Sequence, residues 1–115
     1  MRNPRFSPIL NNMQLTDLSG AELIRFRVDA SSLEGEMTLE LRHLCRARLE
    51  AHPSDVVLEL PHVRFVDSQS IGTLLWLVQT LKKTGHRLSI QGATAELRQL
   101  MRAMLLDQYI ELTKN

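Results

Sequence analysis

A short segment rich in hydroxyl groups carries the side chains of this chain that could support chemistry. It contains Asp67, Ser68, Gln69, Ser70 and Gly72. Before it, residues 56–66 are mostly apolar, and after it apolar residues recur at helical spacing over 73–81. The first turn of a helix has backbone N–H groups without partners and carries the positive end of the helix dipole. A phosphate group on Ser68 would therefore be favoured there.

The same residues also have ordinary structural explanations. Aspartate is a preferred N-cap, since its carboxylate accepts hydrogen bonds from the first N–H groups of a helix, and this would account for Asp67. Serine is common in turns, so local chemistry alone does not make Ser68 regulatory. Ser70 is a competing phosphate acceptor, whereas Thr73 is expected to lie deeper along the helix.

No other motif indicates catalysis or a cofactor. The histidines lack the paired spacing of a metal site, and no nucleophile elbow, phosphate-binding loop or dinucleotide fingerprint is present. These histidines are His43, His52, His62 and His86. The single cysteine, Cys45, has no cysteine-protease context and is expected to be a small core residue. The sequence therefore predicts a binding protein that has no metal or cofactor and is not an enzyme.

Length and composition predict one domain in the cytoplasm. The chain has 115 residues, 43% hydrophobic and 23% charged, which suits a single globular domain. No apolar stretch approaches the roughly 20 residues that span a bilayer, and the first residues lack the apolar core of a secretory signal. We therefore expect no membrane insertion. A lone cysteine agrees with a reducing compartment.

Charge argues against a nucleic-acid partner. The net charge is +1, without the concentrated basic patch of a dedicated nucleic-acid binder. Arg42, Arg46 and Arg48 share one expected helix, but glutamates are interspersed with them. We interpret this helix face as solvated and of mixed charge.

Periodicity predicts strands alternating with helices. Residues 1–12, with two prolines, should form an arm or linker, and residues 13–115 the domain. A capping box at 31–34 should start the first helix at about Leu33, and Gly85 should close the second. The expected elements are strands at 13–18, 22–28, 56–60, 87–91 and 109–112, and helices at 33–51, from about 69 to 84, and 94–105. This order favours an α/β fold, an open mixed sheet packed with helices and with 56–60 near its centre.

Two features of the second expected helix bear on contacts. Its apolar stripe is predicted to contain Ile71, Leu74, Leu75, Val78 and Leu81. Trp76 lies off this stripe, so it is available for a contact. Partial burial or cover by the arm is favoured over a partner surface, and exposed apolar residues on this helix would permit a weak homodimer.

The segment from the apolar strand through the second helix resembles the STAS domain of bacterial anti-sigma factor antagonists. The resemblance covers about 22–112 and is strongest over 56–81, with support from 88–92. It implies a STAS fold, with Ser68 as the phosphorylated serine. Asp67, Gln69, Ser70 and Gly72 would shape the surface that faces the partner. Gln69 and Ser70 stand where many relatives have a small residue and glycine.

The resemblance also implies a mechanism of partner switching. The protein would bind an anti-sigma factor that is also a serine kinase, phosphorylation of Ser68 would end binding, and a serine phosphatase would restore it. The main alternative is a STAS accessory subunit of a lipid-transport ABC complex, in which Ser68 would help docking on the ATPase. A nucleotide-binding module is less favoured, because no phosphate-cradling loop or pair of metal carboxylates is visible.

Overall fold

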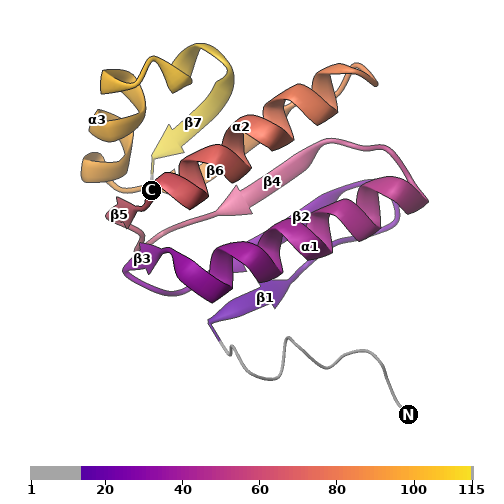
Figure 1. The fold of residues 1–115 in the computed structure, drawn as a ribbon, viewed down its shortest axis with the longest axis horizontal. Helices are drawn as coiled ribbons and strands as arrows, with labels where there is room; N and C mark the ends of the chain where they lie inside the picture. The colour runs from indigo at the N-terminus through magenta and orange to yellow at the C-terminus, as the bar shows by residue number, and fades with distance from the viewer. Residues whose placement is uncertain (1–13, 115) are drawn as a thin grey trace.

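The computed structural model describes residues 14–114, which form a mixed sheet with helices packed on it (Figure 1). Five strands pair in the order β1-β2-β4-β6-β7. Their bounds are β1 Leu15–Asp17, β2 Ile24–Val28, β4 Val56–Glu59, β6 Leu88–Ala93 and β7 Ile110–Lys114. The β1–β2 pair is antiparallel and the other three pairs are parallel. The predicted mixed sheet, with the apolar strand β4 at its centre, is confirmed.

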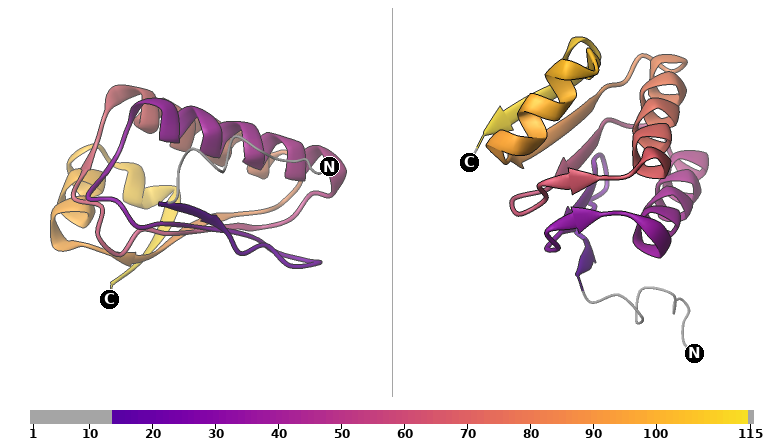
Figure 2. Two further views of the ribbon diagram at one scale, coloured as in Figure 1. Left: turned by 90° about the horizontal axis from the view of Figure 1, so that it is seen from below. Right: turned by 60° about the vertical axis from the view of Figure 1, so that its left-hand side comes forward.

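Helices connect the parallel strands, as right-handed crossovers in such sheets require. Their bounds are α1 Gly35–Ala51, α2 Ser68–Lys82 and α3 Ala95–Ala103, followed by the 3-10 turn η2 Leu106–Gln108. Helices α1 and α2 lie side by side on the same face of the sheet (Figure 2). Two very short strands, β3 Ser32–Leu33 and β5 Phe65–Val66, pair with each other just before these two helices.

The core lies between the sheet and its helices. Alternate residues of β2 are buried, and the strand register aligns Phe26 with Leu58 and Leu58 with Ile90. All three side chains are fully buried, as are Leu41 and Cys45 of α1. Burial raises the pKa of the Cys45 thiol to about 12, so the thiol is protonated at neutral pH. Cys45 is a core residue, as the sequence predicted.

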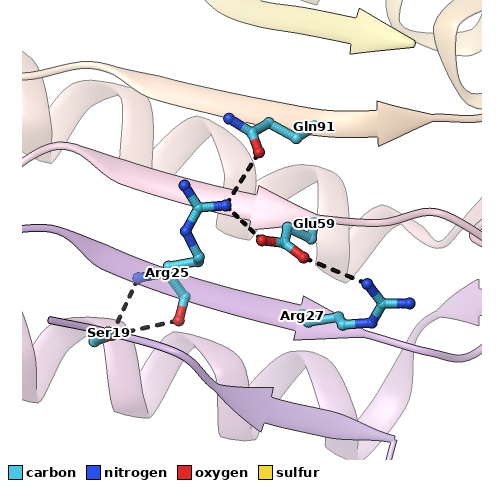
Figure 3. Close-up of polar contacts among 5 residues, drawn as sticks. All are labelled: Ser19, Arg25, Arg27, Glu59 and Gln91. Atoms are coloured by element: carbon cyan, nitrogen blue, oxygen red, sulfur yellow. Dashed lines mark hydrogen bonds and ion pairs between the residues drawn. The ribbon is translucent and has the colours of Figure 1, made fainter. Parts of the chain in front are cut away.

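The opposite face of the sheet carries a network of polar side chains (Figure 3). Glu59 of β4 accepts hydrogen bonds from Arg25 and Arg27 of β2. Arg25 also donates a hydrogen bond from Nη1 to Oε1 of Gln91 on β6, at 3.1 Å. The backbone N–H of Arg25 donates a hydrogen bond to the hydroxyl oxygen of Ser19. Side-chain exposure of 27% for Arg25 and 20% for Glu59 leaves the network in contact with water. It ties three strands together across a solvated surface.

Helix α1 begins later than predicted. The expected start at Leu33, with a capping box ending at Glu34, is wrong, because Leu33 belongs to β3 and is buried. Parallel pairing of Leu33 with Val66 holds this residue in extended geometry. Gly35 then takes a φ of 60°, which only glycine adopts readily, and the helix follows. The N-cap residue Glu34 makes no side-chain cap hydrogen bond.

The buried face of α2 also differs from the predicted stripe. Leu74 and Leu81 are buried as expected, but Leu75 is 38% exposed and the other two members are half-buried. The buried positions are Ser70, Thr73, Leu74, Leu77 and Leu81. Ser70 belongs to this face because Thr38 of α1 provides a hydrogen-bond partner for it. An apolar pattern cannot reveal such a position.

The remaining predicted elements are confirmed, with small shifts at their ends. The strand expected at 87–91 continues to Ala93, and Gly92 within it takes a φ of 70° at an irregularity in the β6–β7 register. No helix in the range 14–114 is long and apolar enough to cross a membrane. The predicted arm, 1–12, lies outside the described residues and stays a prediction.

Replacing Leu58 with alanine should lower the free energy of unfolding by about 2 to 5 kcal/mol, because the central strand loses a fully buried side chain. Leu18→Ala is the control, since Leu18 is 45% exposed, and it should change stability by about 0.5 kcal/mol or less. Urea unfolding followed by circular dichroism measures both. Equal losses in the two variants would contradict this core.

Candidate functional site

The predicted segment lies where β5 leads into α2, next to the start of α1. The pairing of β3 with β5 aligns Leu33 with Val66, and this alignment brings the two helix starts together (Figure 1). Asp67 follows β5 directly and is the N-cap residue of α2, with extended backbone geometry. Ser68 is therefore the first residue of the helix. The predicted position of Ser68 at a helix start is confirmed.

The carboxylate of Asp67 contacts the starts of both helices. Its Oδ1 accepts hydrogen bonds from the backbone N–H of Ser70, at 2.8 Å, and from the Ser70 hydroxyl, at 2.7 Å. Its Oδ2 accepts a hydrogen bond from the backbone N–H of Gly35, at 3.3 Å. Since Glu34 provides no side-chain cap for α1, Asp67 takes that role from the neighbouring element. One side chain therefore caps two helices.

Ser70 connects this cap to the packing of α1 on α2. Its hydroxyl oxygen lies 2.6 Å from Oγ1 of Thr38 and 2.6 Å from the carbonyl oxygen of Leu33, and both hydroxyl side chains are fully buried. The Leu33 carbonyl and the Asp67 carboxylate share the single hydrogen of Ser70, because neither can donate. Thr38 therefore donates to Ser70. The result is a buried polar junction of four residues.

The hydrogen bonds that reach Asp67 hold its pKa below the ordinary aspartate value. The largest contribution comes from the Ser70 hydroxyl, followed by the Ser70 backbone N–H, and the Gly35 N–H adds to it. Each of these donors stabilises the ionised carboxylate. Asp67 is therefore a fixed negative charge at neutral pH, next to the exposed Ser68.

The predicted site residues separate into an exposed group and a buried one. Ser68, Gln69 and Gly72 are exposed, and no hydrogen bond to the Ser68 hydroxyl occurs within the described part of the chain. Asp67 is half-buried, and Ser70 is fully buried. The expectation that Ser70 competes as a phosphate acceptor is wrong for this conformation, because the core encloses its hydroxyl. Its influence on a partner would pass through the loop that it holds.

Thr38 of this junction, and Gly35, which contacts Asp67, were not singled out from the sequence. Thr38 interrupts an apolar helix face that includes Leu41 and Cys45, and a polar residue at such a position indicates a buried hydrogen bond. This signal was available. The contact of Gly35 with Asp67 spans 32 positions and had no local signal in the sequence.

Trp76 is half-buried, and α1 accounts for its cover. The guanidinium groups of Arg42 and Arg46 lie over its ring, so the expectation of partial burial is confirmed. Arg48, the third arginine of the helix, forms an ion pair with Asp17 of β1. The helix face that the sequence presented as mixed charge thus has specific contacts.

Among residues 14–114, no group of three or more histidine, cysteine, aspartate or glutamate side chains is placed to hold a metal ion. His86 contacts Asp55 through Nδ1 at 3.2 Å, and neither residue belongs to the segment around Ser68.

Comparison with known proteins places the chain among STAS domains. Residues 24–114 match the family model described as Mlab, STAS domain. The structure of the anti-sigma factor antagonist SpoIIAA in its unphosphorylated form is similar, with a TM-score of 0.71 and 15% identity over 86% of this chain and 85% of that one. A candidate anti-sigma factor antagonist from Thermotoga maritima has a TM-score of 0.68 and 14% identity, over 79% of this chain and 80% of that one. No curated protein sequence matches. At these identities the two structures establish the fold, and the fold predicted from the sequence is confirmed.

A double-mutant cycle should reveal the coupling of Thr38 and Ser70. Thr38→Val and Ser70→Ala should each cost about 1 to 3 kcal/mol of unfolding free energy, because each leaves a buried partner unsatisfied. The double variant should lose less than the sum of the two, by about 0.5 to 3 kcal/mol. Ser68→Ala is the matched serine control and should be nearly neutral. Additive losses would contradict the shared hydrogen bond.

Asp67 should make stability depend on pH in the acid range. Its folded pKa is lowered, so its contribution is present above the ordinary aspartate pKa of about 3.9 and is lost as the pH falls through the lower folded pKa. Asp67→Asn keeps a capping oxygen without the charge. The urea midpoint of the wild type should therefore fall more than that of Asp67→Asn between neutral pH and about pH 3. Asp107→Asn, at an exposed position, is the control, and parallel curves for wild type and Asp67→Asn would refute the assignment.

Proposed function

The chain belongs to the STAS domain family, and on this basis we propose that it is an anti-sigma factor antagonist that works by reversible binding. Its partner is a cognate anti-sigma factor that is also a serine kinase. The unphosphorylated protein binds this kinase, phosphate on Ser68 ends the complex, and a serine phosphatase restores it. The likeness to SpoIIAA, an anti-sigma factor antagonist, supports the proposal.

The exposed Ser68 hydroxyl at the first position of α2 is the observation that carries the proposal. A kinase needs an accessible hydroxyl, and Ser68 is exposed, whereas Ser70 is fully buried. The free N–H groups and positive dipole of the helix start favour the phosphate once it is attached. Among the hydroxyl groups of this segment, Ser68 is the one suited to modification.

Phosphorylation would change association and leave the fold intact. A phosphate adds about −1.5 to −2 charge and three acceptor oxygens. The buried contacts of the junction belong to Ser70 and Thr38, so modification of Ser68 breaks none of them. The added charge lies beside the ionised Asp67 and makes this surface strongly negative. A partner surface that fits the neutral hydroxyl would then be repelled by the added charge or held apart by the added phosphate.

The partner-binding surface in this proposal extends beyond Ser68. Gln69 and Gly72 are exposed on the first turns of α2, and Gly72 has no side chain to obstruct close approach. Phe65 of β5 is 53% exposed and adds an apolar contact two residues before Asp67. Ser70 and Asp67 hold the loop in place from below. Aromatic residues, including phenylalanine, are enriched in protein–protein interfaces.

Phosphosite mapping in the native cell tests the proposal. Protein recovered from resting and stressed cells should carry phosphate on Ser68, and the phosphate should be absent in Ser68→Ala. Ser31→Ala is the matched control, because Ser31 is another exposed serine near the same loop. The unphosphorylated protein should copurify with a serine kinase, and the Ser68-phosphorylated form should bind that kinase at least about tenfold more weakly, a loss of about 1.4 kcal/mol.

Two results would reject the switch. One is a Ser68 that stays unmodified in every growth state. The other is a kinase complex that survives phosphorylation. Copurification with a transporter ATPase, without any kinase, would favour the accessory-subunit alternative.

A further inference from the structure

We propose that the seam between the outer faces of α1 and α2 is a second docking surface, which binds an acidic segment of a protein partner. The seam is formed by Leu39, Arg42 and Arg46 of α1, Trp76 of α2 and Lys83 just after it. The two helices run side by side (Figure 1), and Arg42 and Arg46 of α1 contact Trp76 of α2. This inference does not depend on phosphorylation of Ser68 or on the proposed function.

Two cationic groups are fixed on one aromatic ring. The guanidinium carbon of Arg42 lies 4.9 Å from the centroid of the Trp76 ring, and that of Arg46 lies 5.3 Å from it. Both distances fall within the range of cation–π attraction. The arginines are one turn apart on α1, so both reach the same ring on α2. The ring thereby reduces the freedom of two side chains that would otherwise be mobile.

These two arginines lack a negative partner in the described part of the chain. Arg25, Arg27 and Arg48 form ion pairs with carboxylates, but Arg42 and Arg46 do not. The N–H groups of a guanidinium suit a carboxylate in a bidentate arrangement. The seam therefore presents two ordered guanidinium groups that no carboxylate of residues 14–114 pairs with.

A hollow beside Trp76 extends the positive surface. Its volume is about 450 Å³, and it is lined by Trp76, Gln79, Thr80, Lys82 and Lys83. No carboxylate is among these lining residues. The indole thus has arginines on the α1 side and lysines at the end of α2, four cationic groups in all. Leu39, 52% exposed, adds apolar surface on α1.

Charge complementarity identifies the occupant as an acidic and partly apolar protein segment. Carboxylates on such a segment would face the arginines and lysines, and an apolar side chain would contact Trp76 and Leu39. Tryptophan and arginine are among the residues enriched in interface hot spots. Complementary charge raises the rate of association and selects the partner. If the two arginines served only to cover the indole, the seam would bind no acidic segment.

Trp76 is the single tryptophan of the chain, so its fluorescence reports occupation of the seam directly. The probe is a short synthetic peptide of glutamate and leucine repeats, titrated into the full protein. Its binding should shift the Trp76 emission and should weaken as salt is added. Arg42→Gln combined with Arg46→Gln keeps a polar side chain at each position and removes both charges. It should weaken binding about fivefold, as expected for two surface charge contacts of about 0.5 kcal/mol each.

The controls remove charge elsewhere or change the probe. Arg87→Gln with Arg102→Gln removes two exposed charges outside the seam and should leave peptide affinity within about twofold, since distant surface charges are screened. The same peptide with lysine in place of glutamate should not bind. Equal losses in the two double variants, or no emission change with the acidic peptide, would overturn the proposal. A response to phosphatidylglycerol vesicles but not to the peptide would also overturn it, and would assign a membrane surface instead.

Discussion

The carboxylate of Asp67 is the contact on which the arrangement of the site depends. It accepts hydrogen bonds from the starts of α1 and α2, two helices whose first residues are 33 positions apart in the sequence. Without it, α1 has no side-chain cap and α2 loses its own. The short β3–β5 pair supports the same geometry, because it delivers Leu33 and Val66 side by side. The exposed surface around Ser68 is therefore built on a hydrogen-bonded and largely buried base.

Two serines separated by one residue have opposite roles at this point. Ser70 faces inward and contacts Thr38, Leu33 and Asp67. Ser68 faces solvent. This arrangement lets a surface group change its charge without disturbing the interior, because the hydrogen bonds between the two helix starts are made by Ser70 and Asp67 and none involves the Ser68 hydroxyl. A helix start with a single serine could provide either the buried contact or the exposed hydroxyl, but not both.

Much of this fold could be predicted from the sequence, and the failures share a cause. Apolar runs and alternation located β2, β4 and β6, and the position of Ser68 at a helix start followed from the change of period after Val66. The two-residue strands β3 and β5 were missed because they have no periodicity and exist only through their mutual pairing. Ser70 was placed on the surface because a serine among apolar residues looks exposed until its partner on another helix is known. Local pattern revealed the elements, and contacts between distant residues decided the site.

The burial of Cys45 has a consequence for observing the molecule in motion. Its thiol is enclosed between α1 and the sheet, and burial raises the pKa of that thiol to about 12. Because only an exposed thiolate reacts with alkylating reagents, Cys45 is inert while the helix is seated. The rate at which Cys45 is labelled therefore reports how often the contact between α1 and the sheet opens. Cys45 is therefore a built-in probe for the opening of the helix whose start contacts Asp67.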